Sequence, residues 1–223
     1  MGQMLTLTAA DGFVLGAYRA DPTGTPKGAL VVVQEIFGVN SHIRNVTDQF
    51  AGLGYVAIAP AIFDRASPGI ELGYDQAGID TGLKARTDIP IDGTLADLQA
   101  AIDAVKDVGK VGIVGYCWGG TLAYLAGGKL TGLAAAVGYY GGQIASSFLD
   151  VAPKVPTMLH FGETDHGIPL ADVQKIIDRY PDMPIHVYGA GHGFNCDQRG
   201  SYDKPSAELA LTRTLEFFHQ NLA

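Results

Sequence analysis

Cys117 lies in a sequence pattern that is typical of an attacking nucleophile. Residues 115–120 read GYCWGG, a G-x-C-x-G motif that follows the apolar run 111–114 and precedes an apolar-periodic segment. Such a motif sets a side chain on a sharp turn between a strand and a helix, and its glycines leave room for that turn. Chance produces such a match in roughly 4% of chains with this many Gly and two Cys, so the motif needs partners before it predicts chemistry.

Three further reactive side chains come shortly after predicted strands, as Cys117 does. They are Glu35, Asp165 and His192. Because the carboxyl ends of parallel strands meet at one edge of a sheet, we expect all four side chains at one site. The order Cys, Asp, His along the chain is that of the catalytic triad on α/β-hydrolase folds. We therefore expect Cys117 to attack a substrate, His192 to transfer protons and Asp165 to orient His192.

Short apolar runs alternate with helical patterns along the chain, which predicts a doubly wound α/β sheet. Continuous β-branched runs such as 29–33 suit parallel strands that are buried on both faces. The first two runs instead alternate between apolar and polar residues and are joined by a turn at Asp11-Gly12, which predicts an antiparallel pair. We expect a single α/β-hydrolase domain over residues 1–223, with a mostly parallel sheet and an N-terminal antiparallel strand pair. The predicted strands are 4–8, 13–19, 29–33, 55–59, 110–114, 133–139, 155–161 and 185–188; the predicted helices are 41–53 (capped by Ser41), 92–108, 169–180 and 206–220.

The stretch from Pro60 to Pro90 interrupts this alternation. It has no clear hydrophobic period and carries several Gly and Pro residues. Long irregular segments in compact domains are commonly functional loops, so we expect this stretch to run over the mouth of the site.

The composition limits the class of partner and the location. The 223 residues are 47% hydrophobic and 17% charged, and the formal net charge of −8 argues against nucleic acid or an anionic membrane surface as a partner. We expect a small-molecule ligand and a monomer or small homo-oligomer. Residues 1–10 form no apolar leader and no apolar run reaches about 18 residues, so we expect a cytoplasmic protein. A reducing compartment favours free thiols over a Cys117–Cys196 disulfide.

His192 is the histidine best suited to proton transfer, because it alone of the six lies on a glycine-flanked loop, 190–193. An imidazole with a pKa near neutrality suits both directions of proton transfer. Two histidines at element ends stay open as alternatives, namely His42 and His166. Three others fit packing or surface roles: His160, His186 and His219.

The other candidates also have simpler structural explanations. A lone cysteine after a strand is commonly a small buried apolar residue, and Asp165 could cap a turn. Glu35 could be an ordinary loop carboxylate, although a carboxylate at a buried strand end needs a partner such as Cys117 or an arginine. The motif and the chain order favour the catalytic interpretation.

Two rival motifs fit less well. A dinucleotide-binding G-x-G-x-x-G turn would need glycine where Cys117 stands. A metal site from Asp165, His166 and His192 is possible on residue type, but no H-x-x-x-H or C-x-x-C spacing supports it. We therefore expect no metal and no cofactor.

Five separate segments carry a resemblance to a known family. They read QEIFGVN (34–40), GYCWGG (115–120), GYYG (138–141), GETDH (162–166) and GHGF (191–194). In this order, and over nearly the whole chain, they resemble the dienelactone hydrolase (carboxymethylenebutenolidase) family. The resemblance implies a triad of Cys117, His192 and Asp165. It also implies that Glu35 pairs with the resting thiol and helps to deprotonate it once substrate enters. The oxyanion hole that it implies is formed by two backbone N–H groups, those of Ile36 and Trp118.

The chain departs from the family where a substrate carboxylate would be bound. In an ungapped reading, the family's two carboxylate-binding arginines fall on Asp80 and Cys196. We expect Arg86 and Arg199 as substitutes, with Arg199 close enough in sequence to His192 to reach the site. The remaining expected substrate-binding residues are aromatic: Phe37 and Phe194.

Cys196 allows two interpretations. It could be a buried, inert thiol, which is the commoner role of a free cysteine. Alternatively, it could lie near Cys117 and modulate the oxidation of that thiol.

A thiol nucleophile favours acyl transfer to activated substrates. Thiolate is a good leaving group, so a tetrahedral intermediate formed on an amide tends to expel sulfur unless the amine is protonated well. We therefore expect hydrolysis of small esters or lactones through a thioester on Cys117, rather than cleavage of peptides. The alternative is a non-hydrolytic protein that uses the thiol for ligand binding or redox sensing.

Overall fold

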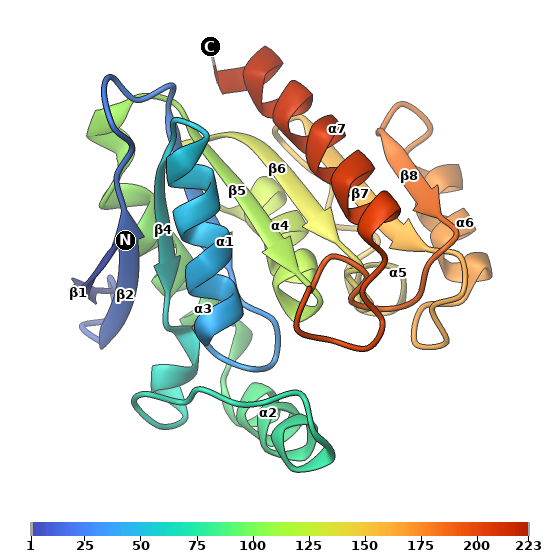
Figure 1. Cartoon of the computed structure of the whole chain (residues 1–223), viewed down its shortest axis with the longest axis horizontal. Helices are drawn as coiled ribbons and strands as arrows, with labels where there is room; N and C mark the ends of the chain where they lie inside the picture. Colours follow the sequence, from blue (N-terminus) through green and yellow to red (C-terminus); the bar gives the residue numbers. More distant parts are fainter. Residues whose placement is uncertain (1, 223) are drawn as a thin grey trace.

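An eight-stranded sheet forms the centre of the molecule (Figure 1), and the computed structural model describes residues 2–222. The strands are β1 (Gln3–Thr8), β2 (Val14–Ala20), β3 (Ala29–Val33), β4 (Val56–Pro60), β5 (Val111–Tyr116), β6 (Leu133–Tyr139), β7 (Thr157–Gly162) and β8 (Ile185–Tyr188). In space they follow the order β1-β2-β4-β3-β5-β6-β7-β8. β2 pairs antiparallel with β1 and with β4, and the remaining pairs are parallel. The mostly parallel sheet with an N-terminal antiparallel pair is confirmed.

Helices cover both faces of the sheet (Figure 1). They are α1 (Ser41–Gly52), α2 (Gln76–Asp88), α3 (Ile91–Asp103), α4 (Trp118–Lys129), α5 (Ile144–Ser147), α6 (Leu170–Arg179) and α7 (Lys204–Leu222), with 3₁₀ turns η1 (Ile62–Arg65) and η2 (Lys106–Val108). α1 and α7 pack into one apolar cluster, and α3 and α4 pack into a second on the opposite face. Because both faces are covered, every residue of β3 and β5 is buried, which explains their continuous apolar sequences.

The cap of α1 and the end of α3 differ from those that the sequence predicts, and α7 (Lys204–Leu222) extends past its predicted range of 206–220 at both ends. The side chain of Asn40, not that of Ser41, caps α1 by accepting a hydrogen bond from the N–H of Ile43 at 3.2 Å. The predicted helix over 92–108 ends at Asp103, and η2 follows it. Val105 is still buried beyond the end of the helix, so the apolar spacing continues although the helix does not.

Residues 60–90 contain a helix, α2, that the sequence does not predict. Its buried face consists of Gly78, Gly82 and Ala85 and therefore carries no large apolar side chain and no hydrophobic period. These small residues allow a close approach to neighbouring backbone, since a Cβ on Gly82 would collide with the carbonyl oxygen of Ile36. α2 lies beyond the carboxyl ends of the strands, apart from both helix layers (Figure 1). This position brings it next to the loop that follows β3.

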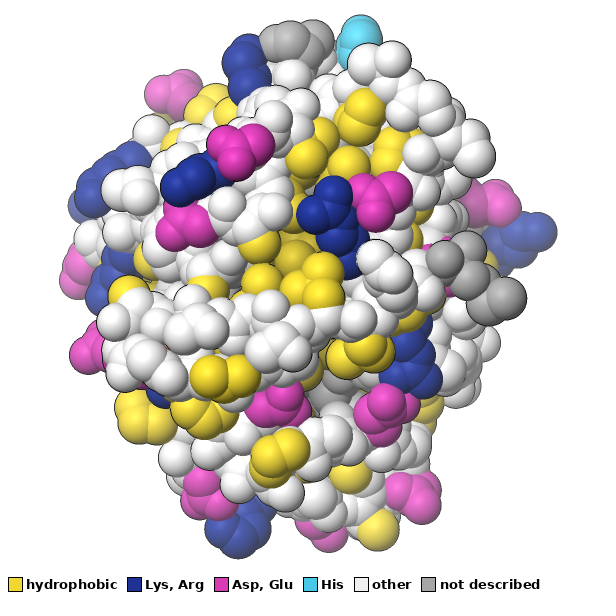
Figure 2. Space-filling view, turned by 90° about the vertical axis from the view of Figure 1, so that its left-hand side faces the viewer, with side chains coloured by type: hydrophobic (Ala, Val, Ile, Leu, Met, Phe, Trp, Pro, Cys, Tyr) yellow, Lys and Arg dark blue, Asp and Glu magenta, His cyan; other side chains and the backbone are white. Residues whose placement is uncertain are grey.

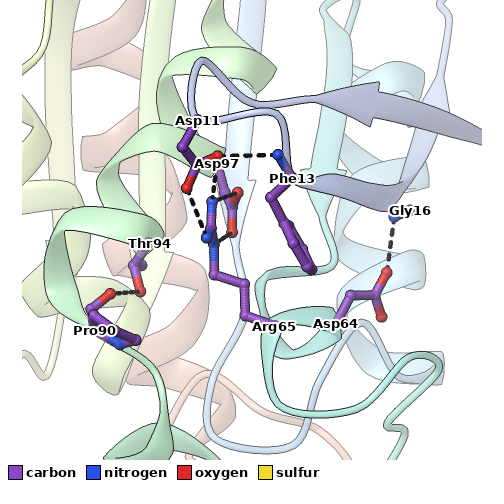
Figure 3. Close-up of polar contacts among 8 residues, drawn as sticks. All are labelled: Asp11, Phe13, Gly16, Asp64, Arg65, Pro90, Thr94 and Asp97. Atoms are coloured by element: carbon purple, nitrogen blue, oxygen red, sulfur yellow. Dashed lines mark hydrogen bonds and ion pairs between the residues drawn. The ribbon is translucent and has the colours of Figure 1, made fainter.

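A buried ion pair ties η1 to α3 and to the β1–β2 turn (Figure 3). Arg65 donates two hydrogen bonds to Asp97, from Nε to Oδ2 and from Nη2 to Oδ1, each at 2.7 Å. Its guanidinium also contacts Asp11 at 2.9 Å and lies 4.4 Å from the centre of the Phe13 ring. Asp97 is completely buried, and burial raises the pKa of its carboxyl even though the pairing with Arg65 lowers it.

The face that carries β1 and β2 has mixed charge (Figure 2). Acidic and basic side chains are interspersed over it, and hydrophobic side chains gather near its centre. Met4 and Val14 are the exposed large hydrophobic side chains of these two strands. Within residues 2–222, no helix combines the length and the apolar composition that crossing a membrane requires.

We predict that Arg65→Met lowers the free energy of unfolding by about 3–5 kcal/mol, because it leaves the buried Asp97 carboxylate without its partner. Urea unfolding followed by circular dichroism measures this change. The matched control is Arg19→Met, which removes a pair with the exposed Asp21 and should change the free energy of unfolding by no more than about 1 kcal/mol. Equal effects of the two substitutions would contradict the role assigned to the buried pair.

Candidate active site

Cys117 occupies a strained one-residue turn between β5 and α4. β5 ends at Tyr116 and α4 begins at Trp118. Cys117 has a φ of 56° and a ψ of −117°, a conformation that non-glycine residues rarely adopt and that costs about 1–3 kcal/mol. Two hydrogen bonds hold the backbone of Cys117. Its N–H donates to the carbonyl of Tyr139 at 3.0 Å, and its carbonyl accepts from the N–H of Gly120 at 3.0 Å. The residue is only partly buried, so the thiol is accessible.

Close packing, rather than positive φ, accounts for the glycines that flank Cys117. A Cβ on Gly115 would collide with the carbonyl oxygen of Gly119. A Cβ on Gly119 would collide with the carbonyl oxygens of Val33 and Gln34, at the end of β3. The small residues therefore bring the first turn of α4 directly against the strand ends.

Cys117, His192 and Asp165 form one hydrogen-bonded series. The Sγ atom of Cys117 lies 3.2 Å from Nε2 of His192, and Nδ1 of His192 lies 2.7 Å from Oδ2 of Asp165. The Asp165 side chain is completely buried, whereas that of His192 is 30% exposed. Because an ionised carboxylate can only accept, Nδ1 carries a proton and Nε2 faces the sulfur. The arrangement allows the imidazole to exchange a proton with the thiol and with a bound group.

Asp165 combines the two roles that the sequence leaves open. Its Oδ1 accepts hydrogen bonds from the N–H groups of Gly167 and Ile168, at 2.8 and 3.2 Å. Its Oδ2 faces His192. The turn bonds hold the carboxylate in place, so the same residue caps the turn and orients the imidazole.

The pKa of His192 differs from the neutral value that the sequence suggests. Burial by itself lowers this pKa, but the hydrogen bonds to Asp165 and Cys117 and the charges of both partners outweigh burial and raise the pKa to about 10. The imidazole is therefore protonated at neutral pH. The protonated ring thus places a positive charge next to the sulfur atom of Cys117, 3.2 Å from Nε2.

Glu35 pairs with an arginine and not with the resting thiol that the resemblance implies. Its carboxylate is 1% exposed, and Oε1 lies 3.3 Å from Nη1 of Arg199. The contact of Cys117 Sγ is with His192 instead. A buried carboxylate needs a compensating charge, which Arg199 supplies. The guanidinium of Arg199 also lies over the rings of Phe37 and Tyr74, at 5.6 and 5.8 Å.

The other expected substrate-binding residues lie at different depths. Phe194 is completely buried and Phe37 is 2% exposed, so both rings support the loops, and the structure does not present them to an open pocket. Arg86, in the last turn of α2, lines a cavity of about 280 Å³ together with Trp118 and Thr121. The ring neighbours of Phe194 are Tyr139, Tyr140 and Tyr188.

Two backbone N–H groups near the thiol are without acceptors. Among residues 2–222, neither the N–H of Ile36 nor that of Trp118 donates a hydrogen bond. Trp118 is the first residue of α4, and its N–H has no acceptor within the helix for that reason. Ile36 follows Glu35 in the loop after β3 and is packed against α2 through Gly82. That these two groups form an oxyanion hole stays a prediction.

Asp80 and Cys196, on which the ungapped reading places the family's arginines, contribute no charged side chain to the interior of the site. Asp80 is exposed on α2 and accepts a hydrogen bond from Gln76 at 2.8 Å. Cys196 is completely buried, and burial together with the nearby charge of Glu35 raises the pKa of its thiol to about 11. Both cysteines are free. A buried, weakly acidic thiol argues against the interpretation in which Cys196 modulates the oxidation of Cys117.

Tyr140 is a site residue to which the sequence assigns no role. Its φ is 41°, its ring lies 5.1 Å from that of His192, and its buried hydroxyl has no hydrogen-bond partner. The only hint in the sequence is the GYYG segment (138–141), which is one of the five segments that resemble the family but to which the sequence assigns no function. His42 and Tyr74 also lie close to Glu35, from segments that carry no catalytic motif.

The strand order and the positions of these side chains define an α/β-hydrolase. A nucleophile candidate follows β5, a carboxylate follows β7 and a histidine follows β8, in a doubly wound sheet. The chain belongs to the Dienelactone hydrolase family, whose sequence profile matches residues 15–222.

Individual relatives agree with this membership. The chain is 37% identical over 235 positions to a Synechocystis sp. protein provisionally named carboxymethylenebutenolidase, covering 93% of this chain and 92% of that protein. It is 33% identical to a carboxymethylenebutenolidase of Pseudomonas putida, covering 96% and 94%. A solved structure from Klebsiella pneumoniae, provisionally named dienelactone hydrolase, matches with a TM-score of 0.83 at 29% identity, covering 98% of this chain and 99% of that one. The family supports a hydrolase of esters or lactones.

We predict that Asp165→Asn slows alkylation of Cys117 by iodoacetamide at pH 7 about 10- to 100-fold, because a hydrogen bond to a charged group is worth about 1.5–3 kcal/mol. Asp165 raises the pKa of His192, so its loss makes the imidazole a weaker base for the thiol proton. The rate should recover at higher pH, where solvent hydroxide removes that proton. Peptide mapping by mass spectrometry measures the rate at Cys117.

The matched control for this substitution is Asp178→Asn, which changes an exposed carboxylate on α6 that is bonded only to Gln174. It should alkylate at the wild-type rate. Alkylation of Asp165→Asn at the wild-type rate at pH 7 would contradict the coupling of Asp165 to the thiol.

Proposed function

We propose that this protein hydrolyses small esters or lactones through a thioester intermediate on Cys117. The observation that carries the proposal is the hydrogen-bonded series from Sγ of Cys117 through His192 to the buried carboxylate of Asp165. Family membership supports the carbonyl substrate class. The good leaving ability of thiolate favours activated esters and enol lactones over amides.

In the first half of the reaction, the thiolate of Cys117 attacks the carbonyl carbon. The carbonyl oxygen takes the negative charge and accepts hydrogen bonds from the N–H groups of Ile36 and Trp118, each of which would lower the barrier by roughly 3 kcal/mol. The carbon–oxygen bond of the ester or ring then breaks. Protonated His192 gives its proton to the departing oxygen, which leaves an acyl group on sulfur and a neutral imidazole.

In the second half, the neutral imidazole acts as a base. Two of the influences that raise the pKa of His192 come from Cys117, and a thioester sulfur supplies neither the charge nor the same hydrogen bond. Acylation therefore lowers the pKa of His192, which accepts a proton from water as the water attacks the thioester. The thiolate leaves, and the resting pair of Cys117 and His192 is restored.

Arg199 is the candidate group for binding a substrate carboxylate. Its side chain is 19% exposed and is already held beside the site by Glu35. A substrate carboxylate at Arg199 would compete with Glu35 for the guanidinium. Arg86, in the cavity beside Trp118, is a second cationic position. The exposed Asp80 does not oppose an anionic substrate from within the site.

We predict that Cys117→Ala and His192→Gln each lower the rate of hydrolysis by about 10⁴-fold or more, because both residues act in the same covalent steps. Initial rates with a chromogenic acetate, an anionic enol lactone and the methyl ester of that lactone measure this loss. Comparing the two lactones shows whether a free carboxylate on the substrate lowers KM. The matched control is His166→Gln, an exposed histidine beside Asp165 that should keep wild-type activity.

Undiminished turnover by Cys117→Ala would overturn the mechanism. A wild-type protein whose thiol is modified stoichiometrically, with no turnover on any of the three substrates, would favour the alternative of a non-hydrolytic ligand-binding or redox-sensing protein. Family membership does not favour that alternative.

A further inference from the structure

Glu35, His42 and Cys196 form a buried cluster beside the proposed active site. One potential ligand atom from each residue lies within 4.8 Å of the other two. Their exposed fractions are 1%, 3% and 0%. Glu35 follows β3, His42 lies in the first turn of α1, and Cys196 lies in the loop between β8 and α7. The cluster therefore joins three segments at the carboxyl end of the sheet.

Two atoms of this cluster lack the partners that burial requires. Oε2 of Glu35 and Nε2 of His42 are buried and have no hydrogen-bond partner among residues 2–222. Nδ1 of His42 lies 3.3 Å from Oδ1 of Asp197. Because the Asp197 carboxylate can only accept, Nδ1 carries a proton, and in the neutral form of the imidazole Nε2 then presents a lone pair. Oε2 and Nε2 therefore lie in one enclosed space with the Cys196 thiol, and no hydrogen bond from residues 2–222 reaches either atom.

We propose that Glu35, His42 and Cys196 bind one divalent ion of the Zn²⁺ class. Carboxylate oxygen, imidazole nitrogen and thiolate sulfur are the ligands that Zn²⁺ takes in proteins, and three protein ligands leave a fourth position for water. Bonds of about 2.0–2.1 Å to O and N and about 2.3 Å to S place tetrahedral ligand atoms roughly 3.3–3.6 Å apart, so the cluster must contract by about 1.5 Å at most. A sulfur–metal bond replaces the S–H bond of Cys196, and the proton leaves to solvent.

The surroundings of the cluster fit a bound cation. Asp197 accepts from the far nitrogen of His42, the arrangement that commonly orients a metal-binding imidazole. The hydroxyl of Tyr74 hydrogen-bonds to Cys196 and would stabilise its thiolate. The carboxylate of Glu35 and the thiolate of Cys196 are the anionic ligands of the ion, and Glu35 keeps its contact with Arg199 through its other oxygen, Oε1.

The His42 side of the cluster borders a cavity. A cavity of about 430 Å³ is lined by His42, Asp197 and Tyr116, among other residues. The proposed ligands are residues 35, 42 and 196, which are too far apart in the sequence to form a spacing motif. For that reason we expect no metal from the sequence alone. The proposed ion lies outside the hydrogen-bonded series of Cys117 and shares only Glu35 with the proposed hydrolytic site, so metal binding can be measured without reference to hydrolysis.

We predict that untagged, chelator-treated Cys117→Ser protein binds one equivalent of Co²⁺ and develops a sulfur-to-cobalt charge-transfer band, which one equivalent of Zn²⁺ abolishes. Absorbance titration measures both. Serine at position 117 removes the only other thiol, so the band reports Cys196 alone. Cys196→Ser in the same background should lose the band while its circular dichroism spectrum stays unchanged.

Asp197→Asn tests the same proposal without touching the buried core. The Asp197 side chain is 64% exposed, and removing its charge should weaken Co²⁺ binding about 10- to 100-fold. Asp178→Asn, on the exposed face of α6, should leave the affinity unchanged. The proposal is overturned if Cys117→Ser protein shows no charge-transfer band, if the band survives in Cys196→Ser, or if Asp197→Asn binds Co²⁺ as tightly as its parent. None of these results bears on ester hydrolysis.

Discussion

The structure depends on a one-residue turn that holds Cys117 in a left-handed backbone conformation. Strain of about 1–3 kcal/mol persists only where the surroundings leave the backbone no alternative. Here β5 is buried along its whole length, and all of α4 except its last residue is buried. Gly115 and Gly119 press the turn against neighbouring carbonyl groups, so neither element can shift. The position of the thiol is therefore set by the packing of the core, not by contacts within the site.

The turn at Cys117 also determines the electrostatics of the site. It places the sulfur of Cys117 3.2 Å from His192, and the buried Asp165 carboxylate holds the other side of the same ring. The proton affinity of the imidazole then depends on the state of the sulfur, because both neighbours raise the pKa of His192. One histidine can act as an acid beside a thiolate and as a base beside a thioester. The same geometry thus serves both halves of the proposed reaction.

Some of this arrangement could be predicted because parallel strands buried on both faces leave continuous apolar runs, and the reactive residues follow those runs closely. The helix α2 could not be predicted, because its buried face is built from glycine and alanine and shows no hydrophobic period. The partner of Glu35 could not be predicted from the sequence for a different reason. Arg199 lies 164 residues further along the chain, and sequence spacing carries no information about a contact that only the fold creates. The same holds for His42 and Cys196, which α1 and the loop after β8 bring to Glu35.

The chemistry assigned to the sulfur of Cys117 is tested most directly by mass spectrometry of the wild-type protein, quenched with acid during turnover of a chromogenic acetate. A thioester mechanism predicts one acetyl group on the peptide that contains Cys117, which hydroxylamine releases and which disappears once the substrate is consumed. Steady hydrolysis with an unmodified Cys117, or an acetyl group on a different residue, would contradict it.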